Sequence, residues 1–248
     1  MIEATVSSFS RPTRPEVEMR VAIADDDPEI LRQIEAVARD AGHDCVSFTN
    51  GRDMLTALSR ETFDVVLLDW NMPEATGLEI LQRSLQKLED PPTFILLTSR
   101  SDKDDVVRGL EAGASDYIVK PESSEVIRAR IEAAARKAGR GQAKRFGEFG
   151  PYKVDYLQKS IELNGESIKL TSKEFQLAVL FFENINRPLS RGYIFSQVWS
   201  SANDLETRTL DMHMSRVRSK LALRPENGFV IQTVFGFGYR MDTYQDVE

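Results

Sequence analysis

The sequence has little of what builds disulfide-rich, cysteine-metal or membrane proteins. Its 248 residues include one cysteine, Cys45, which excludes a disulfide framework and a cysteine metal cage. No apolar run approaches the roughly 18 residues that a membrane span needs. The N-terminal segment lacks the basic start and apolar stretch of a signal peptide. We therefore expect a cytoplasmic protein with no membrane partner.

Basic residues are not in excess either, since the formal net charge is −7. Residues 1–147 hold 20 Lys and Arg against 26 Asp and Glu, and residues 148–248 hold 12 against 13. Net charge therefore gives no support to nucleic-acid binding, which would have to rest on a local basic cluster. The length favours two domains, and the 41% apolar and 29% charged residues are typical of globular proteins.

Short apolar segments alternate with segments of helical spacing in the first half of the chain. The apolar segments are nearly continuous, which is typical of strands buried on both faces of a parallel sheet. The predicted strands are 19–25, 43–49, 63–69, 92–99 and 115–120, and the predicted helices are 28–42, 52–60, 77–89, 103–113 and 124–139. This order predicts a doubly wound α/β domain with a five-stranded parallel sheet at 19–138. We interpret residues 1–18 as a flexible extension and 139–147 as a linker.

The pattern changes in residues 148–245. Residues 152–170 alternate between apolar and polar, with a hairpin turn at Asn164-Gly165. A capping box, Thr171 to Glu174, opens a helical segment. Two more helical segments and a glycine-punctuated hairpin at 229–242 follow. Helices followed by a hairpin predict a winged helix-turn-helix α+β domain.

Acidic and polar side chains stand where the predicted parallel strands end, which is the ligand-binding edge of such a sheet. They are Asp25, Asp26 and Asp27 after the first strand, Asp69 after the third, Thr98 at the end of the fourth and Lys120 after the fifth. Clustered carboxylates repel one another unless a cation joins them, and oxygen-only ligands favour Mg²⁺. The set predicts a site where Asp69, which ends an apolar strand, accepts a phosphoryl group.

Each of these features alone has an ordinary explanation, as a helix cap, a strand residue or a turn. Their order on four strand ends is much harder to assign to chance. A phosphatase with an Asp nucleophile is an alternative, but such enzymes need a second Asp two residues later as general acid. Asn71 stands at that position, which counts against an enzyme.

The helical segment 207–223 has two faces. The apolar stripe is Leu210, Met214, Val217 and Leu221, and the polar stripe beside it is Thr209, His213, Arg216 and Lys220. From Arg208 to Arg224 there are five Lys and Arg against one Asp. A cationic face on a helix with a buried back is what insertion into a DNA major groove requires. Arg216 is the strongest candidate for a base contact, because a guanidinium can grip guanine with two hydrogen bonds.

The motifs IADDDPEI, VVLLDWNMPEATG, ILLTSR and SDYIVKP together resemble the receiver domain of two-component response regulators. The resemblance implies a flavodoxin-like receiver with a bound Mg²⁺. The implied roles are Asp69 as phosphoacceptor, Asp25, Asp26, Asp69 and the Asn71 carbonyl as metal ligands, Thr98 and Tyr117 as switch pair, and Lys120 as phosphate-binding lysine.

The second half resembles the effector domain of the OmpR/PhoB family, in LTSKEFQLAVLF, PLSRGYIFSQVW, RTLDMHMSRVRSKL and IQTVFGFGYR. The implied DNA contacts are Arg208, Thr209, His213, Arg216 and Arg218, with Trp199, Thr233 and Tyr239 bracing or touching the backbone near the wing. The helical wheel places Arg218 off the polar stripe, so we expect a phosphate contact or an internal salt bridge there. The family usually carries an arginine in the wing turn, where this chain has Phe235. A minor-groove arginine contact is therefore in doubt.

The resemblance also implies a homodimer through the fourth helix, fifth strand and fifth helix of the receiver. The charged residues Arg108, Asp116 and Arg130 match that surface, whereas Ser115, Glu122 and Val126 depart from it. Because exposed ion pairs contribute only about 0–1 kcal/mol each, we expect a dimer that is weaker or less strictly coupled to phosphorylation.

These inferences predict a transcriptional regulator whose Asp69 takes a phosphoryl group from a sensor histidine kinase. Phosphorylation then favours dimerisation and binding to promoter half-sites, with RNA polymerase as a further candidate partner. The alternative is a regulator of the same architecture that binds DNA without phosphorylation and uses the receiver as a constitutive dimer module.

Overall fold

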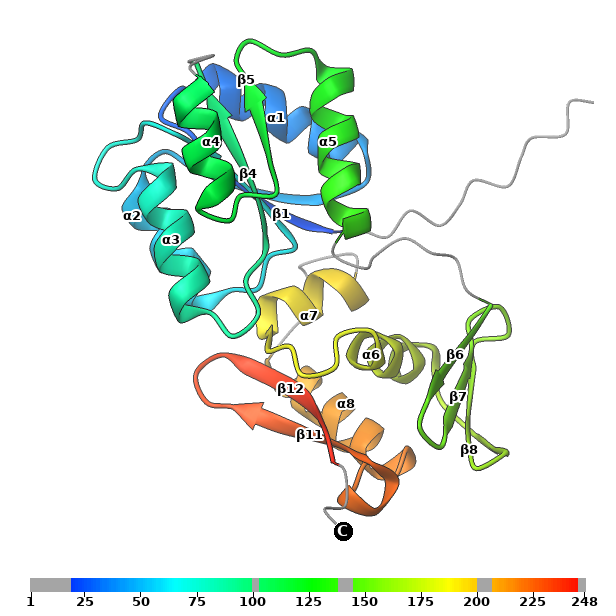
Figure 1. The fold of residues 1–248 in the computed structure, drawn as a ribbon. Helices are drawn as coiled ribbons and strands as arrows, with labels where there is room; N and C mark the ends of the chain where they lie inside the picture. The colour runs from blue at the N-terminus through cyan, green and yellow to red at the C-terminus, as the bar shows by residue number, and fades with distance from the viewer. Residues whose placement is uncertain (1–18, 100–102, 138–144, 200–206, 245–248) are drawn as a thin grey trace, which may run out of the picture.

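The computed structural model describes residues 19–99, 103–137, 145–199 and 207–244, which form two domains in contact (Figure 1). The first domain has the predicted alternation. Its strands are β1 (Arg20–Ala24), β2 (Asp44–Phe48), β3 (Val65–Asp69), β4 (Thr93–Thr98) and β5 (Asp116–Val119). Its helices are α1 (Pro28–Asp40), α2 (Gly51–Arg60), α3 (Gly77–Lys87), α4 (Lys103–Glu111) and α5 (Ser124–Lys137). The predicted α/β domain is confirmed.

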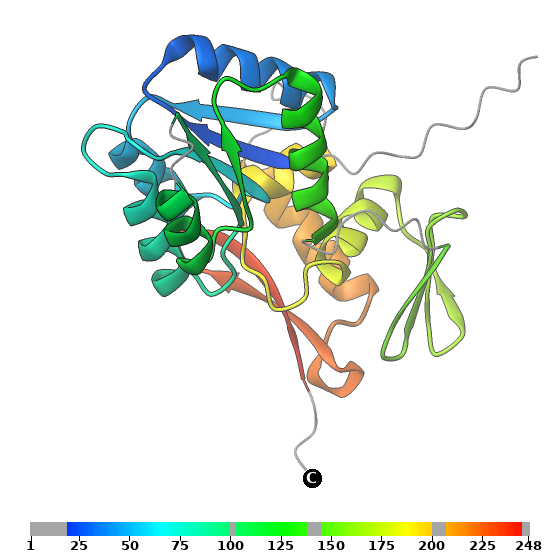
Figure 2. The same ribbon diagram turned by 45° about the horizontal axis from the view of Figure 1, so that its top comes forward.

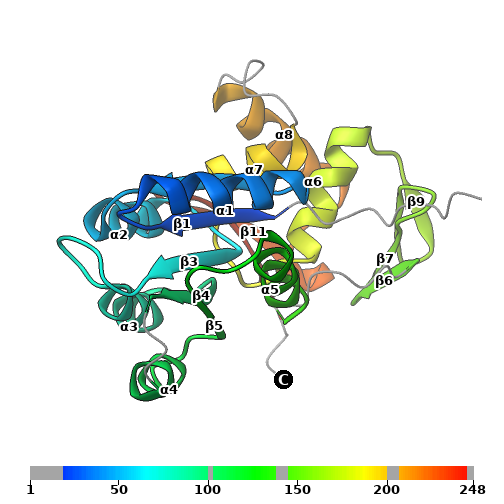
Figure 3. The ribbon, with the colours of Figure 1, turned by 90° about the horizontal axis from the view of Figure 1, so that it is seen from above.

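The five strands form one parallel sheet in the order β2-β1-β3-β4-β5. Side chains alternate across β3: Val65 and Leu67 pack with α1 and α5, while Val66 and Leu68 pack with α2 and α3. In the view from above, α5 lies on one side of β3–β5 and α3 and α4 lie on the other (Figure 3). Burial on both faces explains why the strands are almost wholly apolar.

The described part of the second domain contains two antiparallel sheets, three α-helices and one short 3₁₀ helix. The strands are β6 (Phe146–Phe149), β7 (Tyr152–Asp155), β8 (Ser160–Leu163), β9 (Glu166–Ile168), β10 (Leu189–Ser190), β11 (Phe229–Val234) and β12 (Gly238–Thr243). The helices are α6 (Ser172–Phe182), α7 (Arg191–Val198), α8 (Thr207–Lys220) and the short 3₁₀ helix η2 (Pro225–Asn227). The sheets have the orders β6-β7-β8-β9 and β10-β12-β11, so the predicted winged-helix α+β architecture is present.

Local sequence features account for several boundaries in the second domain. Asn164 (φ 52°) and Gly165 (φ 84°) form the predicted β8–β9 turn, a left-handed conformation that favours Asn and Gly. Thr171 and Glu174 form the predicted capping box of α6. One expectation needs adjustment: β6 begins at Phe146, inside the predicted linker 139–147, and pairs with β7. A four-residue strand that contains a glycine is hard to distinguish from a linker by composition.

The core of the second domain gathers around α6 and α8. The predicted apolar stripe of α8, namely Leu210, Met214, Val217 and Leu221, is fully buried, with each residue 0% exposed. Tyr152, Phe182 and Phe229 form an aromatic cluster against these helices. The opposite face of α8 is therefore free to meet a ligand.

The domains touch at the end of the parallel sheet where β1, β3 and β4 begin. Backbone N–H of Thr62, just before β3, donates to Oγ of Ser190, just before α7, at 3.0 Å. The β6–β9 sheet stands apart from the receiver sheet (Figure 2). Within the described ranges, no helix is long and apolar enough to cross a membrane.

Candidate functional sites

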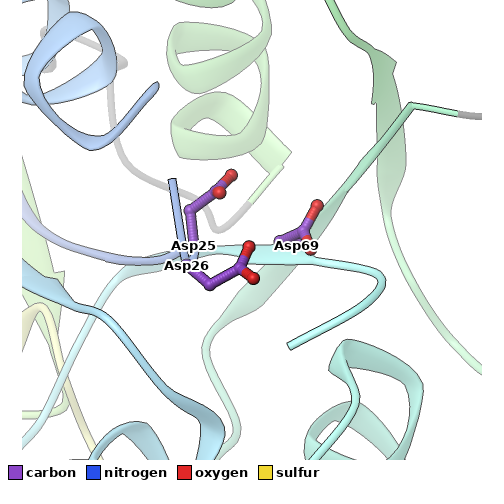
Figure 4. Close-up of side chains that lie close together, drawn as sticks. All are labelled: Asp25, Asp26 and Asp69. Atoms are coloured by element: carbon purple, nitrogen blue, oxygen red, sulfur yellow. The ribbon is translucent and has the colours of Figure 1, made fainter. Parts of the chain in front are cut away.

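Three carboxylates come together beyond the carboxyl ends of β1 and β3. Ligand oxygens of Asp25, Asp26 and Asp69 all lie within 4.8 Å of one another (Figure 4). Asp25 is 0% exposed and Asp69 is 6% exposed, whereas Asp26 faces solvent. Asp27, the third residue of the acidic run, instead caps α1 by accepting from the backbone N–H of Glu29 at 2.8 Å. The parallel topology explains the cluster, because adjacent strands end at one edge.

Lys120, just after β5, reaches into this cluster. Its Nζ lies 2.5 Å from a carboxylate oxygen of Asp25 and 2.5 Å from one of Asp69. Burial on its own would lower the pKa of Lys120, but its hydrogen bonds with Asp25 and Asp69 raise it above its usual range. Lys120 is therefore a permanent cation beside Asp69.

The backbone around Asp69 is fitted closely. The N–H of Asn71 donates to the other carboxylate oxygen of Asp69 at 3.0 Å. A Cβ at Gly77, the first residue of α3, would lie 2.3 Å from the carbonyl oxygen of Asp69, so only glycine fits there. The Asn71 residue thus lies beside Asp69 as expected, and its carbonyl stays a predicted metal ligand.

The charge balance of the cluster leaves room for a further cation. Burial raises the pKa of Asp69 above its ordinary value of 3.8; Lys120 opposes this shift and the nearby Asp25 adds to it. Three carboxylates thus share one ammonium. An oxygen-only donor set with one solvent-facing member, Asp26, suits Mg²⁺, which keeps several of its waters when bound. The residues present therefore fit the predicted ion.

The predicted switch pair lies on adjacent strands. Thr98 ends β4 and is 3% exposed, while Tyr117 in β5 is half-buried and pairs in register with Leu96. A small cavity between α4 and β5 is lined by Trp70, Thr98 and Tyr117, among others. The guanidinium of Arg130 lies over the Tyr117 ring, 6.0 Å from its centroid. Tyr117 and Thr98 therefore line the same small cavity.

The outward face of α8 is the candidate nucleic-acid interface. Arg216 is exposed, and His213 is half-exposed with its ring 5.6 Å from that of Trp199. Burial, followed by the nearby Arg216, lowers the pKa of His213, so the imidazole is neutral at pH 7. Arg208 and Thr209 lie in the first turn of α8, and their side chains are outside the described part of the structure.

Other predicted DNA contacts are engaged within the domain. Arg218 donates from Nε to the carbonyl of Ile231 at 3.0 Å and from Nη2 to Thr233 at 3.4 Å, and it stacks over Tyr239. Lys220 pairs with the buried carboxylate of Glu174 at 2.6 Å. Arg218, for which a phosphate contact or an internal salt bridge is expected, therefore braces the wing through hydrogen bonds, and its phosphate contact stays a prediction. Lys220 is held by α6.

Tyr239 is also an internal residue, since it is 4% exposed and its hydroxyl donates to Asp211. Asp211 in turn pairs with Arg191 at 2.8 Å. Thr233 remains exposed on the wing, and Phe235 at its tip is fully exposed. The wing thus presents an apolar tip where the resemblance implied a cation.

Residues 21–132 match the family described as "Response regulator receiver domain", and residues 165–241 match "Transcriptional regulatory protein, C terminal". The phosphate regulon transcriptional regulatory protein PhoB of Pseudomonas aeruginosa is 32% identical over 224 residues, which cover 90% of this chain and 97% of that protein. The chain belongs to the OmpR/PhoB family of response regulators.

The solved response regulator DrrB of Thermotoga maritima is 29% identical and covers 91% of this chain and 99% of its own, with a TM-score of 0.45. Another curated relative agrees with the assignment: the DNA-binding response regulator MtrA of Mycolicibacterium smegmatis is 32% identical over 221 residues, covering 89% of this chain and 96% of that protein. From the family matches and the curated relatives, this regulator is a two-component response regulator with a DNA-binding domain, which favours a regulator over the hydrolase considered on sequence grounds.

The charged residues of the predicted dimer face pair within the regulator itself. Nη1 of Arg130 lies 2.8 and 2.6 Å from the two carboxylate oxygens of Asp116, and Arg108 lies 3.7 Å from Asp105. Val107 and Leu110 on α4 are exposed apolar side chains next to these pairs. The surface combines apolar and charged groups, and its use in dimerisation stays a prediction.

Sequence reasoning missed several residues that shape the sites. Trp70 packs under α4, where a Cβ on Gly109 would lie 3.1 Å from its ring. Asp211 and Glu174 hold Tyr239 and Lys220 in place. Gly109 opposite Trp70 indicates close packing only once α4 and the segment after β3 are known to be adjacent.

Proposed function

We propose that this regulator accepts a phosphoryl group on Asp69 from a sensor histidine kinase, and that the modified receiver controls dimerisation and promoter binding. The observation that carries the proposal is the Lys120 ammonium 2.5 Å from Asp69 inside the cluster of three carboxylates. Three carboxylates meet at this edge and burial raises the pKa of Asp69, a combination typical of functional sites.

The chemistry is a phosphoryl transfer between two side chains. A carboxylate oxygen of Asp69 attacks the phosphorus of a phosphohistidine, the P–N bond breaks, and its electron pair returns to the imidazole. Lys120 would hold one phosphoryl oxygen, and Asp25, Asp26 and Asp69 would hold Mg²⁺ together with the Asn71 carbonyl. When bound, Mg²⁺ supplies positive charge for the phosphoryl oxygens, as in other phosphoryl transfers.

The new phosphoryl group adds negative charge and three acceptor oxygens to a buried edge. Thr98 is the nearest predicted donor on β4, and its movement would open space for the Tyr117 ring beside the small cavity under α4. That displacement would alter the surface of α4, β5 and α5. The proposed dimer uses Arg108, Asp116 and Arg130, so phosphorylation would exchange their present partners for those of a second copy.

The proposed DNA surface consists of the solvent face of α8 and the wing. Arg208, Thr209, His213 and Arg216 would contact the major groove, Arg218, Thr233 and Tyr239 would hold or flank the wing, and Lys220, paired with Glu174, would add a DNA contact from the end of α8. Replacing Arg216 by Ala should weaken binding to a cognate half-site by about 1–3 kcal/mol, because a bidentate base contact is lost. Fluorescence anisotropy with Lys169→Ala, an exposed lysine after β9, as a charge-matched control measures this loss.

Phosphorylation itself is tested by incubating the wild type and Asp69→Asn with acetyl phosphate and Mg²⁺. Phosphate-affinity electrophoresis should show one shifted band in the wild type and none in the variant. A shifted band in Asp69→Asn would assign the reaction to another residue. No shift in either protein would favour the phosphorylation-independent regulator with a constitutive dimer module.

A further inference from the structure

The two domains are joined by a buried ion-pair cluster centred on Arg187, in the loop between α6 and β10. Its guanidinium donates from Nη1 and Nη2 to Asp64 at 3.2 Å and from Nη2 to the carbonyl of Phe63 at 2.8 Å. Its Nε lies 2.7 Å from Asp90. Arg187 is 8% exposed and Asp64 is 2% exposed. An arginine that is buried with several partners in the other domain indicates a specific interdomain contact, because an unpaired buried charge is costly.

A second set of bonds joins the domains beside this cluster. The backbone N–H of Thr62 donates to Oγ of Ser190 at 3.0 Å, and the N–H of Ser190 donates back to Oγ1 of Thr62 at 2.8 Å. Ser190 is 0% exposed and caps α7. Its hydroxyl donates to Glu61 at 2.9 Å. Ser190 therefore both caps α7 and binds the receiver.

The fit extends to shape and charge. A Cβ on Gly192 in α7 would lie 2.6 Å from Oε2 of Glu61 and 3.0 Å from Nη1 of Arg20, so the receiver approaches α7 as closely as a glycine permits. At the edge, Arg240 on β12 pairs with Glu89 at 2.7 Å. In the ion pairs of Arg187 and Arg240 that cross between the domains, the receiver contributes the anions and the DNA-binding domain the cations. We call the bonds of Arg187, Ser190 and Arg240 with the receiver the interdomain contact.

The interdomain contact lies away from both proposed working surfaces. Its receiver residues precede β3 and β4, whereas Asp69 lies at the other end of β3, roughly 16 Å away along a strand. Arg108, Asp116 and Arg130 are on α4, β5 and α5. On the DNA-binding domain the contact uses Arg187 in the α6–β10 loop, the start of α7 and one residue of β12, while Arg216 faces solvent on α8. Dimerisation and DNA binding can therefore both occur with this contact intact.

We propose that the interdomain contact holds the receiver and the DNA-binding domain as one rigid body in both phosphorylation states, so that the receiver dimer fixes which half-site spacing the regulator accepts. The rigid-body part stands on the bonds above. The spacing part rests on the proposed function, because it requires a dimer that binds DNA. A freely hinged second domain would instead accommodate several spacings.

Pulsed electron paramagnetic resonance tests the rigid body. It measures the distribution of distances between two nitroxide labels in the full-length chain. Exposed Gln82 on α3 and Gln158 between β7 and β8 are replaced by Cys for labelling. Cys45 can stay, because it is buried and burial raises its pKa to about 12, which suppresses its reaction with the label. We expect one narrow distance in the wild type, unchanged by acetyl phosphate with Mg²⁺.

Two variants should broaden that distribution by different routes. Arg187→Ala removes the central ion pairs, and Gly192→Leu inserts a side chain that must displace the ends of the Glu61 and Arg20 side chains, leaving every charge in place. Arg224→Ala, an exposed arginine after α8, is the charge-matched control and should keep the narrow distance. A broad wild-type distribution, or a narrow one in both contact variants, would overturn the rigid body.

The spacing part is tested with half-sites whose separation is changed by about five base pairs, half a turn of DNA. The phosphorylated wild type should lose at least about tenfold in affinity, since one half-site moves to the opposite side of the duplex. Gly192→Leu should lose much less. Equal tolerance in both proteins would contradict the spacing claim. Absence of any DNA binding would instead reject the proposed function, with the distance measurement unaffected.

Discussion

Strand β3 is bracketed by two buried aspartates that differ in what surrounds them. Asp64, just before the strand, accepts from Arg187 and from the backbone N–H of Arg20 at 2.8 Å. Asp69, at its end, shares Lys120 with Asp25, and burial raises its pKa. The first carboxylate is satisfied by fixed protein groups, whereas the second lies in a cluster with an excess of negative charge. That difference separates a structural aspartate from the one proposed to accept the phosphoryl group.

The largest expected effect contrasts Asp64→Ala with Asp69→Ala. Removing Asp64 leaves the buried Arg187 without its main partner and should cost about 3–5 kcal/mol of unfolding free energy. Removing Asp69 should raise stability, because Lys120 keeps Asp25 and the repulsion between carboxylates falls. Urea denaturation of the receiver, followed by Trp70 fluorescence in a Trp199→Phe background, measures both. Equal destabilisation by Asp64→Ala and Asp69→Ala would contradict the different roles assigned to the two aspartates.

Next in size is a contrast between the two cations. Lys120→Met removes a charged donor from the phosphoryl oxygens and should slow phosphorylation by acetyl phosphate about 10–100-fold, as expected for about 1.5–3 kcal/mol. Arg187 contacts the opposite end of β3 from Asp69, so Arg187→Met should leave the phosphorylation rate unchanged. The rates are followed by phosphate-affinity electrophoresis. A comparable slowing in Arg187→Met would show that the two ends of the strand are coupled.

A smaller effect concerns pH. Because the pKa of Asp69 is raised in the folded state, its acidic form favours folding and its charged form opposes it. Asp69→Asn should therefore match the wild type below pH 3.8, the ordinary Asp value, and become the more stable protein as pH rises through the raised pKa. Denaturation in the presence of a chelator, from pH 3 to 7, measures the stability gap, which is the unfolding free energy of Asp69→Asn minus that of the wild type. A gap that shrinks as pH rises would contradict the sign of the shift.

The smallest expected effect is the response of that gap to Mg²⁺. An ion that binds the folded cluster stabilises the wild type by mass action, so added Mg²⁺ should close the gap with Asp69→Asn. Mg²⁺ that shifts the denaturation midpoint of both proteins equally would place the ion elsewhere.

The sequence was sufficient to predict the Asp69 end of β3 because parallel strands converge there. Asp25, Asp69 and Lys120 follow separate strands, and the topology alone brings them together. The Asp64 end could not be predicted, since Arg187 is 123 residues away and comes from another domain. Neither residue stands in a distinctive motif. Lys220 shows the same limit within one domain: its helical stripe predicts a DNA contact, which stays a prediction, but its ion pair with Glu174 on α6 could not be predicted.

The most direct test of the central claim is DNA-binding affinity with and without acetyl phosphate plus Mg²⁺, for the wild type and Asp69→Ala. If phosphorylation at Asp69 controls promoter binding, treatment with acetyl phosphate and Mg²⁺ should tighten DNA binding by the wild type alone. Equal affinity in all four samples would contradict it.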